Sequence, residues 1–339
     1  MYNMKWCKLI SEKRTGVLQR DFESKNDSRD AFDLDFDTLV SLSNIRRLQD
    51  KAQVFPLEKG DFVRSRLTHS LETMAAAEAL GRNVVDIIKK KYTSLLDNNI
   101  LSEERFVEIN NELTAIVDIP KVLKCSAIMH DMGNPPFGHI GENIISNWCD
   151  TELKKYFYIE EDKRNKIVPY EIKKSESVYS TLYPQQKKDL VNYDGNAQLL
   201  RIINKLGPNG KAISLTYSVI SACMKSVRPS TAKSIGVKSA PAPYKKIGYF
   251  HSEQELVKNI HYEMGTNFDG QYHRNPLAFL LEASDDISYL TSDLEDAVKK
   301  GIIDFNEILD QFKMGAEEEL KKSGIIIKYN IVNNKANRD

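Results

Sequence analysis

The stretch that decides the fold is HDMGNPPFGHIGE, which runs from His130 to Glu142. It begins with a His-Asp pair, and His139 stands three positions before Glu142. Residues 121–131 are predicted to form a buried helix with His130 at its end, because Gly133 and the two prolines that follow cannot continue it. An adjacent His and Asp occur by chance in many chains, so the pair acquires meaning only from the residues around it.

Two further groups complete a candidate metal site: Arg66-Leu67-Thr68-His69 and Asp285-Asp286. Read together with the His-Asp pair, they supply imidazole nitrogens and carboxylate oxygens from His69, His130, Asp131 and Asp285. This mixed set suits a borderline ion such as Mn, Fe, Ni or Zn better than an all-oxygen magnesium cage. Open positions on the ion could hold a water and a phosphate oxygen, so phosphohydrolase chemistry is expected.

Length and composition limit the class of protein. The chain has 339 residues, of which 41% are hydrophobic, so it can bury a substantial core as one large helical domain or two average ones. The formal net charge is zero, so no global field favours nucleic acid. Four cysteines without framework spacing indicate free thiols in a reducing compartment, and no apolar span of 18 residues is present. A soluble, cytoplasmic protein without a membrane anchor is expected.

Hydrophobic periodicity predicts a mainly α-helical fold. Helices are expected over residues 68–91, 101–118, 121–131 and 277–300. The predicted apolar stripe of the first consists of Leu71, Met74, Ala77, Leu80, Val84, Ile87 and Ile88. The predicted stripe of the last consists of Leu280, Ile287, Leu290, Leu294 and Ala297.

Two regions are predicted to be irregular. Residues 162–190 are polar and rich in lysine, and residues 219–246 carry six basic residues and no acidic one. The second region can be a solvated loop or a cationic lid over a polyphosphate, and its composition does not separate these alternatives.

Several motifs in one order give the chain a resemblance. They are RRLQDKAQVFPL (46–57), RLTHSLE (66–72), the His130–Glu142 stretch, DGNAQ (194–198), LTY (215–217), EASDDISY (282–289) and DLEDA (293–297). Over residues 30–305 the chain resembles the deoxyguanosinetriphosphate triphosphohydrolase family of the HD-domain superfamily. The resemblance implies an HD-domain helical metal-dependent phosphohydrolase fold, with residues 1–339 as a single domain and an HD core over about 40–305. Family members usually continue past this C-terminus, so a truncated or an unusual ending is expected.

The resemblance also implies an activity and roles for individual residues. The expected reaction is metal-dependent hydrolysis of dGTP, or other dNTPs, to a deoxynucleoside and tripolyphosphate, with manganese, magnesium or another transition metal. His69, His130, Asp131 and Asp285 would bind the ion, and His139 with Glu142 would handle a proton. Arg66 would act in catalysis and hold phosphates, which Lys225 would also approach. Asp194 would lie near the site as a substrate-binding residue. Gln53 and Asp293 would bind the 3′ hydroxyl, and the ring of Tyr289 would exclude a 2′ hydroxyl.

By resemblance the protein would form a homo-oligomer, a hexamer in this family, with single-stranded DNA as a candidate effector. Two positions depart from the family pattern: Ser226 stands where an aromatic residue is common, and Asp194 where Glu is common. Periodicity alone leaves simpler interpretations open. Asp285, Tyr289 and Asp293 share one helix face that could be exposed to water, and His139 with Glu142 could be a surface pair. The alternative functions are an HD phosphodiesterase or nucleotidase, and a nucleotide or DNA sensor without turnover.

Overall fold

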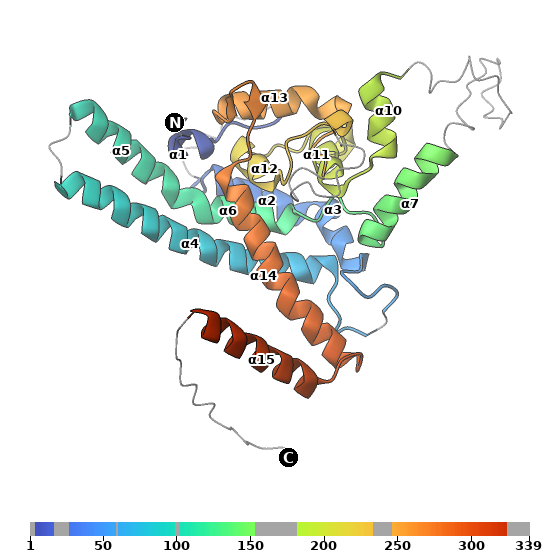
Figure 1. The fold of residues 1–339 in the computed structure, drawn as a ribbon. Helices are drawn as coiled ribbons and strands as arrows, with labels where there is room; N and C mark the ends of the chain where they lie inside the picture. The colour runs from blue at the N-terminus through green and yellow to red at the C-terminus, as the bar shows by residue number, and fades with distance from the viewer. Residues whose placement is uncertain are drawn as a thin grey trace, which may run out of the picture. The chain divides into compact units, whose positions relative to one another are not determined.

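The computed structural model describes residues 4–16, 27–58, 60–98, 102–152, 182–232 and 246–323, and these are mainly α-helical, as predicted (Figure 1). The α-helices are α1 (Trp6–Leu9), α2 (Ala31–Ser41), α3 (Ser43–Arg46), α4 (Arg66–Asn98), α5 (Glu103–Ala115), α6 (Ile119–Met129), α7 (Gly138–Thr151), α10 (Pro184–Val191), α11 (Gly195–Lys205), α12 (Tyr217–Cys223), α13 (Gln254–Glu263), α14 (Pro276–Lys299) and α15 (Phe305–Ser323). Short 3₁₀ turns are η1 (Arg47–Asp50), η2 (Ile116–Asp118), η3 (Pro208–Gly210), η4 (Ser230–Ala232) and η6 (His251–Glu253). Within the described ranges, the strands are β1 (Asn267–Phe268) and β2 (Gln271–Tyr272), an antiparallel pair.

Contacts between residues divide the chain into two compact units. The first unit runs from Met1 to Leu290, and the second from Thr291 to Asp339, so the boundary falls within α14. The first unit contains the hydrophobic core and every metal-ligand candidate. That the whole chain acts as a single domain stays a prediction.

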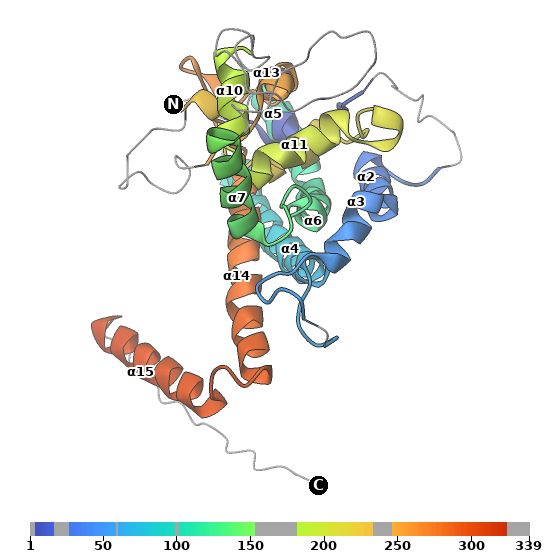
Figure 2. The same cartoon turned by 90° about the vertical axis from the view of Figure 1, so that its right-hand side faces the viewer.

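Helix α6 is the centre of the first unit. Most of its side chains are buried, and it packs against α2, α4 and α12 (Figures 1 and 2). The approach to α4 is close at Gly81, where an added Cβ would lie 3.0 Å from both the Leu123 side chain and the Pro120 backbone. A larger residue at this position would therefore push α4 away from α6, and α4 carries His69.

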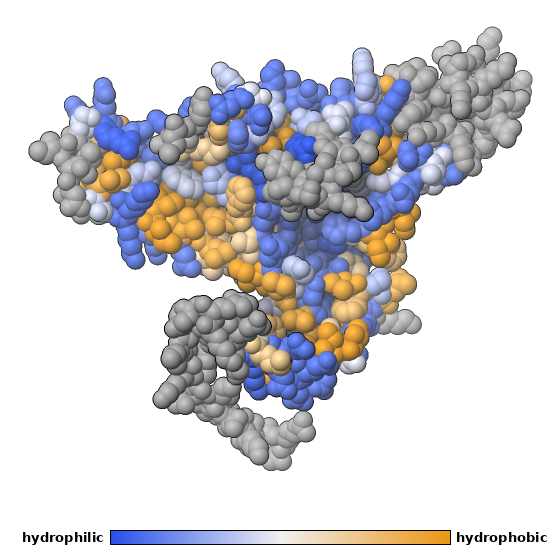
Figure 3. Space-filling view, in the orientation of Figure 1, coloured by the Kyte–Doolittle hydropathy of each residue, from blue (hydrophilic) through white to orange (hydrophobic). Residues whose placement is uncertain are grey.

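The four predicted helices are present, but two of the predicted apolar stripes are partly wrong. On α4 the buried residues include the small Ser70 and Thr73 beside the predicted Ala77, while Leu71 and Ile87 are exposed. The reason is the short distance to α6, which admits small side chains only. On α14, Ile287 and Leu290 are 52% and 56% exposed, whereas Ser284 and Ser288 are buried. Figure 3 shows hydrophobic side chains on the surface along this helix.

The regions predicted to be irregular are partly helical. Residues 162–181 lie outside the described part of the chain, but α10 occupies 184–191, with Pro184 at its first position. In the second region α12 ends at Cys223, and Pro229 forms a bridge with Tyr249, while residues 233–245 lie outside the described part. These corrections follow from tertiary packing, since α12 is fully buried against the core.

All four cysteines are free thiols, as predicted. Among the described helices, none is both long enough and apolar enough to cross a membrane.

Candidate metal centre

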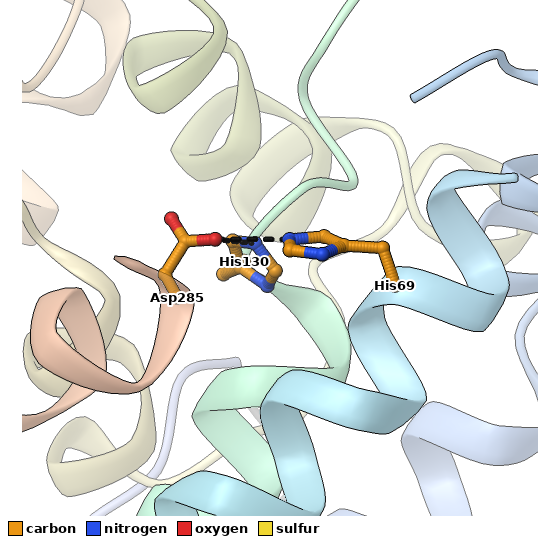
Figure 4. Close-up of side chains that lie close together, drawn as sticks. All are labelled: His69, His130 and Asp285. Carbon is orange, nitrogen blue, oxygen red and sulfur yellow. Dashed lines mark hydrogen bonds and ion pairs between the residues drawn. The ribbon is translucent and has the colours of Figure 1, made fainter. Parts of the chain in front are cut away.

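Three side chains from three separate helices meet in the first unit (Figure 4). His69 lies in the first turn of α4, His130 directly follows α6, and Asp285 lies on α14. Each offers one ligand atom, and these atoms all lie within 4.8 Å of one another. Asp285 Oδ1 is 2.9 Å from His69 Nε2 and 3.4 Å from His130 Nε2. Two imidazole nitrogens and a carboxylate oxygen at these separations form a plausible metal-binding group.

The backbone fixes the orientation of His130. Its Nδ1 lies 2.7 Å from the carbonyl oxygen of Ala127, so Nδ1–H donates there and Nε2 points toward Asp285. Such a bond from the other ring nitrogen is the usual way in which proteins orient a metal-binding histidine. His130 Nε2 is buried and has no hydrogen-bond partner. An unpartnered buried nitrogen costs free energy that a bound cation would recover.

Charged neighbours shift the pKa values of Asp285 and His130 in this group. Burial alone would raise the pKa of Asp285, but His130, His69 and Lys225 together hold the pKa of this carboxyl well below its usual range. Burial likewise opposes protonation of His130, yet the carboxylates of Asp131 and Asp285 raise the pKa of this imidazole. Asp285 is therefore ionised at neutral pH, so it can offer an anionic oxygen to a cation.

Lys225 is one of the groups that lower the pKa of Asp285. Its Nζ lies 2.6 Å from Asp285 Oδ2, on the opposite oxygen from the one that faces the two histidines. Burial would lower the pKa of Lys225, but the ion pair with Asp285 outweighs burial and raises it. The family resemblance predicts Lys225 near the substrate phosphates. Its contact with a metal-ligand candidate sixty positions away could not be predicted from spacing.

Asp131 lies beside the three-residue group, and both of its oxygens already have partners. Oδ2 accepts from Arg66 Nη1 at 2.6 Å, and Oδ1 accepts from Asn134 Nδ2 at 2.5 Å. Oδ1 is also 3.5 Å from His130 Nε2. Burial opposes ionisation, but His130 and Arg66 lower the pKa of Asp131, so it too is a carboxylate. Its role as a fourth ligand stays a prediction.

The turn after His130 is held from two sides. Lys51, on the segment that precedes α4, donates from Nζ to the carbonyl of Asn134 at 2.6 Å. On the other side Gly133 lies against α11, where an added Cβ would come within 2.0 Å of the Gly195 carbonyl oxygen. Only glycine fits such an approach. Lys51 was not among the residues selected from the sequence, although it lies within the RRLQDKAQVFPL motif.

The turn leads into α7 through Phe137, which has a left-handed conformation with φ of 64°. His139 and Glu142 then lie side by side, with His139 Nδ1 2.7 Å from Glu142 Oε2. Glu142 Oε1 accepts from the backbone N–H of Gly195 at 2.7 Å. Burial would raise the pKa of Glu142, but these two bonds lower it, so Glu142 is an anion that orients the imidazole. The His139 side chain is 76% exposed, which suits a group that meets a substrate.

Arg66 is the first residue of α4 and lies between the metal group and α7. One nitrogen binds Asp131, and Nη2 lies 2.6 Å from the position that a Cβ on Gly138 would occupy. Its Nε is buried without a hydrogen-bond partner. Arg66 therefore has donor capacity left for an anion.

The four remaining residues that were predicted to bind substrate have different surroundings in the structure. Gln53 has a buried Oε1 without a partner, so its amide has capacity to bind a ligand. Asp194 caps α11, with Oδ1 accepting from the backbone and side chain of Asn196, which is a structural role that the sequence did not predict. Tyr289 lies one turn after Asp285 and is 41% exposed. Asp293 belongs to the second unit. Substrate contacts of all four stay predictions.

Comparison with known proteins gives an independent result. No protein-family model matches the chain. The chain is 38% identical over 316 residues to a deoxyguanosinetriphosphate triphosphohydrolase-like protein of Listeria monocytogenes, which covers 91% of this chain and 59% of that protein. Deoxyguanosinetriphosphate triphosphohydrolases of Yersinia enterocolitica and Klebsiella pneumoniae are 30% and 32% identical over 310 and 289 residues. These alignments cover 89% and 84% of this chain, and 57% and 53% of the two enzymes.

The chain thus spans somewhat more than half the length of the curated relatives it matches. The similarity extends over most of its own residues. The chain belongs to the deoxyguanosinetriphosphate triphosphohydrolase family.

Proposed function

We propose that this protein hydrolyses deoxynucleoside triphosphates, dGTP among them, at the α-phosphate to a deoxynucleoside and tripolyphosphate. The observation that carries the proposal is the convergence of His69, His130 and Asp285, with an unpartnered imidazole nitrogen, in a chain whose relatives are named for this activity. Mn²⁺ or another divalent transition metal fits this donor set best, and Mg²⁺ is a further candidate.

The residues present fit such an ion. His69 and His130 offer imidazole nitrogens, Asp285 offers an ionised oxygen, and Asp131 lies beside them as a fourth candidate. When bound, a divalent ion would polarise the α-phosphate and orient the attacking water. Loss of one ligand residue would favour a sensor without turnover, but all four candidate residues are present here.

Two basic side chains would hold the phosphates. Arg66 has an unpartnered Nε beside the Asp131 carboxylate, and Lys225 lies within 2.6 Å of Asp285. Both cations are largely desolvated, so their interaction with a phosphate would be stronger than at an exposed site. Negative charge that develops during hydrolysis would be stabilised by groups already in place.

His139 would deliver a proton to the departing 5′ oxygen of the deoxynucleoside. Glu142 fixes the ring by accepting from Nδ1, so the proton in transit would be carried on Nε2, which has no hydrogen-bond partner among the described residues. This is the arrangement of a general acid oriented by a carboxylate. No covalent intermediate with the enzyme is required.

Sugar selection would depend on Gln53, Tyr289 and Asp293. The unpartnered Oε1 of Gln53 can accept from the 3′ hydroxyl, with Asp293 as a second acceptor. The Tyr289 ring, one turn from Asp285 on α14, would leave no room for a 2′ hydroxyl. We also infer a cytoplasmic homo-oligomer, a hexamer by family resemblance, with single-stranded DNA as an effector. Mass determination in solution, with and without an oligonucleotide, tests these last inferences.

The deciding experiment is incubation of Mn²⁺-loaded protein with each dNTP, followed by separation of tripolyphosphate, pyrophosphate and phosphate. Tripolyphosphate and deoxynucleoside in equal amounts are expected, and the Asp285→Asn variant should form neither. Release of a monophosphate with pyrophosphate would instead indicate the phosphodiesterase-type alternative. Saturable dNTP binding without any product would indicate the sensor.

A further inference from the structure

A cavity of about 400 Å³ in the first unit is lined by residues of α7, α10 and α11. These three helices lie close together in Figure 2. Its wall includes Ile145 and Cys149 of α7, Leu190 of α10, Gln198 and Arg201 of α11, and Phe250. None of the metal-ligand candidates lines it. Its size is within the range of about 300–1,000 Å³ that is typical of small-molecule sites.

The wall offers flat, apolar surfaces. The rings of Tyr193 and Phe250 lie 6.4 Å apart with 41° between their planes, and both line the cavity. The Arg201 guanidinium lies 5.1 Å from the centre of the Phe250 ring. Aromatic rings and a stacked guanidinium favour a planar, polarisable ligand.

The charged groups of the wall are already compensated. Arg201 Nε donates to both carboxylate oxygens of the buried Glu253, at 3.0 and 3.1 Å. The two oxygens of Asp189 accept from Ser230 Oγ at 2.6 Å and from the backbone N–H of His251 at 2.7 Å. A polyphosphate would therefore find no uncompensated cation here, and an uncharged ligand fits better.

Hydrogen-bonding capacity nevertheless remains. The Gln198 side-chain amide forms no hydrogen bond with the described residues, although it can both donate and accept. His251 also lines the cavity, and its Nδ1 is buried without a partner. A ligand with donors and acceptors around a flat ring would satisfy such groups.

We propose that this cavity binds an uncharged nucleoside. The choice of nucleoside over other planar molecules rests on the proposed function, whose product is an uncharged deoxynucleoside. The cavity is linked to the proposed acid because Ile145 and Cys149 lie on α7, the helix of His139 and Glu142. The bond between Glu142 and the Gly195 N–H joins that helix to α11 on the other wall. Occupation of the cavity would therefore shift His139 and lower turnover, as product inhibition at a separate site.

Calorimetric titration of metal-free protein with deoxyguanosine tests binding directly. Cys149→Phe would fill the cavity, whereas Cys149→Ser keeps its volume and serves as the matched control. The affinity should fall at least about tenfold in Cys149→Phe and remain unchanged in Cys149→Ser. Gln198→Leu should also weaken binding, and it carries the test if the phenylalanine variant does not fold. Tyr289→Ala, which alters the proposed sugar site, should bind as the wild type does.

Equal affinity in the wild type, Cys149→Phe and Gln198→Leu would overturn the proposal, as would loss of binding in Tyr289→Ala. Tighter binding of dGMP than of deoxyguanosine would contradict the uncharged character of the site. The titration contains no metal and requires no turnover, so it gives a result even if dNTP hydrolysis is not the activity. Hydrolysis without any nucleoside binding would reject this inference and leave the proposed function intact.

Discussion

Replacing Asp285 by asparagine should separate the two roles of its carboxylate, which are binding metal and balancing Lys225. Without metal, the variant loses the 2.6 Å ion pair and leaves the ammonium unpaired. Removing one partner of a fully buried pair costs about 3–5 kcal/mol. Because the two side chains are 18% and 20% exposed, we expect roughly 2–3 kcal/mol here. For a chain of this length that corresponds to a fall of roughly 3–4 °C in the thermal midpoint.

Bound metal should stabilise the wild type against unfolding, but it should not stabilise the Asp285→Asn variant. An ion at 100 times its dissociation constant stabilises the state that binds it by about 2.7 kcal/mol, or roughly 4 °C in this chain. Thermal unfolding with EDTA measures the loss of the ion pair, and thermal unfolding with Mn²⁺ measures the stabilisation by metal. Asp286→Asn is the matched control, since Asp286 is the exposed neighbour on α14, and it should keep the full Mn²⁺ shift.

A second variant tests whether the unpaired Lys225 ammonium causes the fall in the thermal midpoint without metal. Lys225→Met in the Asp285→Asn background removes the unpaired ammonium and should recover part of the lost midpoint. An Mn²⁺ shift of wild-type size in Asp285→Asn would refute the assignment of Asp285 as a ligand.

Three further predictions concern other residues. His139→Ala should keep the Mn²⁺ shift but lower turnover by about a hundredfold or more, as expected for a general acid; wild-type turnover would make His139 and Glu142 a surface pair only. Tyr289→Ala should raise the use of GTP relative to dGTP, and Asp293→Ala should raise KM for dGTP; an unchanged ratio of the two substrates would exclude steric selection by Tyr289. His261 is buried, stacks on Tyr272 at 4.3 Å, and has a pKa lowered to about 4 by burial and by His273. Since the unfolded value is near 6.5, the stability from neutral His261 is complete above that pH and is lost as pH falls toward 4, by up to roughly 3 kcal/mol. Thermal midpoints measured between pH 4 and 7 should fall less steeply in His261→Phe than in the wild type.

The four predicted helices could be found because each has a strong periodic pattern, but the faces they bury were less predictable. Hydrophobicity placed Leu71, Ala77 and Ile87 on the buried face of α4. The structure buries Ala77 as predicted, but it exposes Leu71 and Ile87 and buries Ser70 and Thr73 instead. Side-chain size decides this face, because α6 lies too close for larger residues, and periodicity alone contains no information about that distance.

In the candidate site, local pairings could be predicted from the sequence, whereas contacts between distant segments could not. The His130–Glu142 stretch is continuous in sequence, so the pairing of His139 with Glu142 followed from helical spacing and is present at 2.7 Å. The contact of Lys225 with Asp285 and the support of the Asn134 carbonyl by Lys51 join distant segments. Such contacts depend on how helices pack, so no local pattern predicts them.

The central claim is that water attacks the α-phosphorus of a dNTP at this centre. Hydrolysis of dGTP in H₂¹⁸O by the Mn²⁺-loaded protein, with mass spectrometry of both products, tests it most directly. One ¹⁸O atom should enter the tripolyphosphate, at its former α-phosphate, and none should enter deoxyguanosine. Label in deoxyguanosine, or in released pyrophosphate or phosphate, would contradict the account.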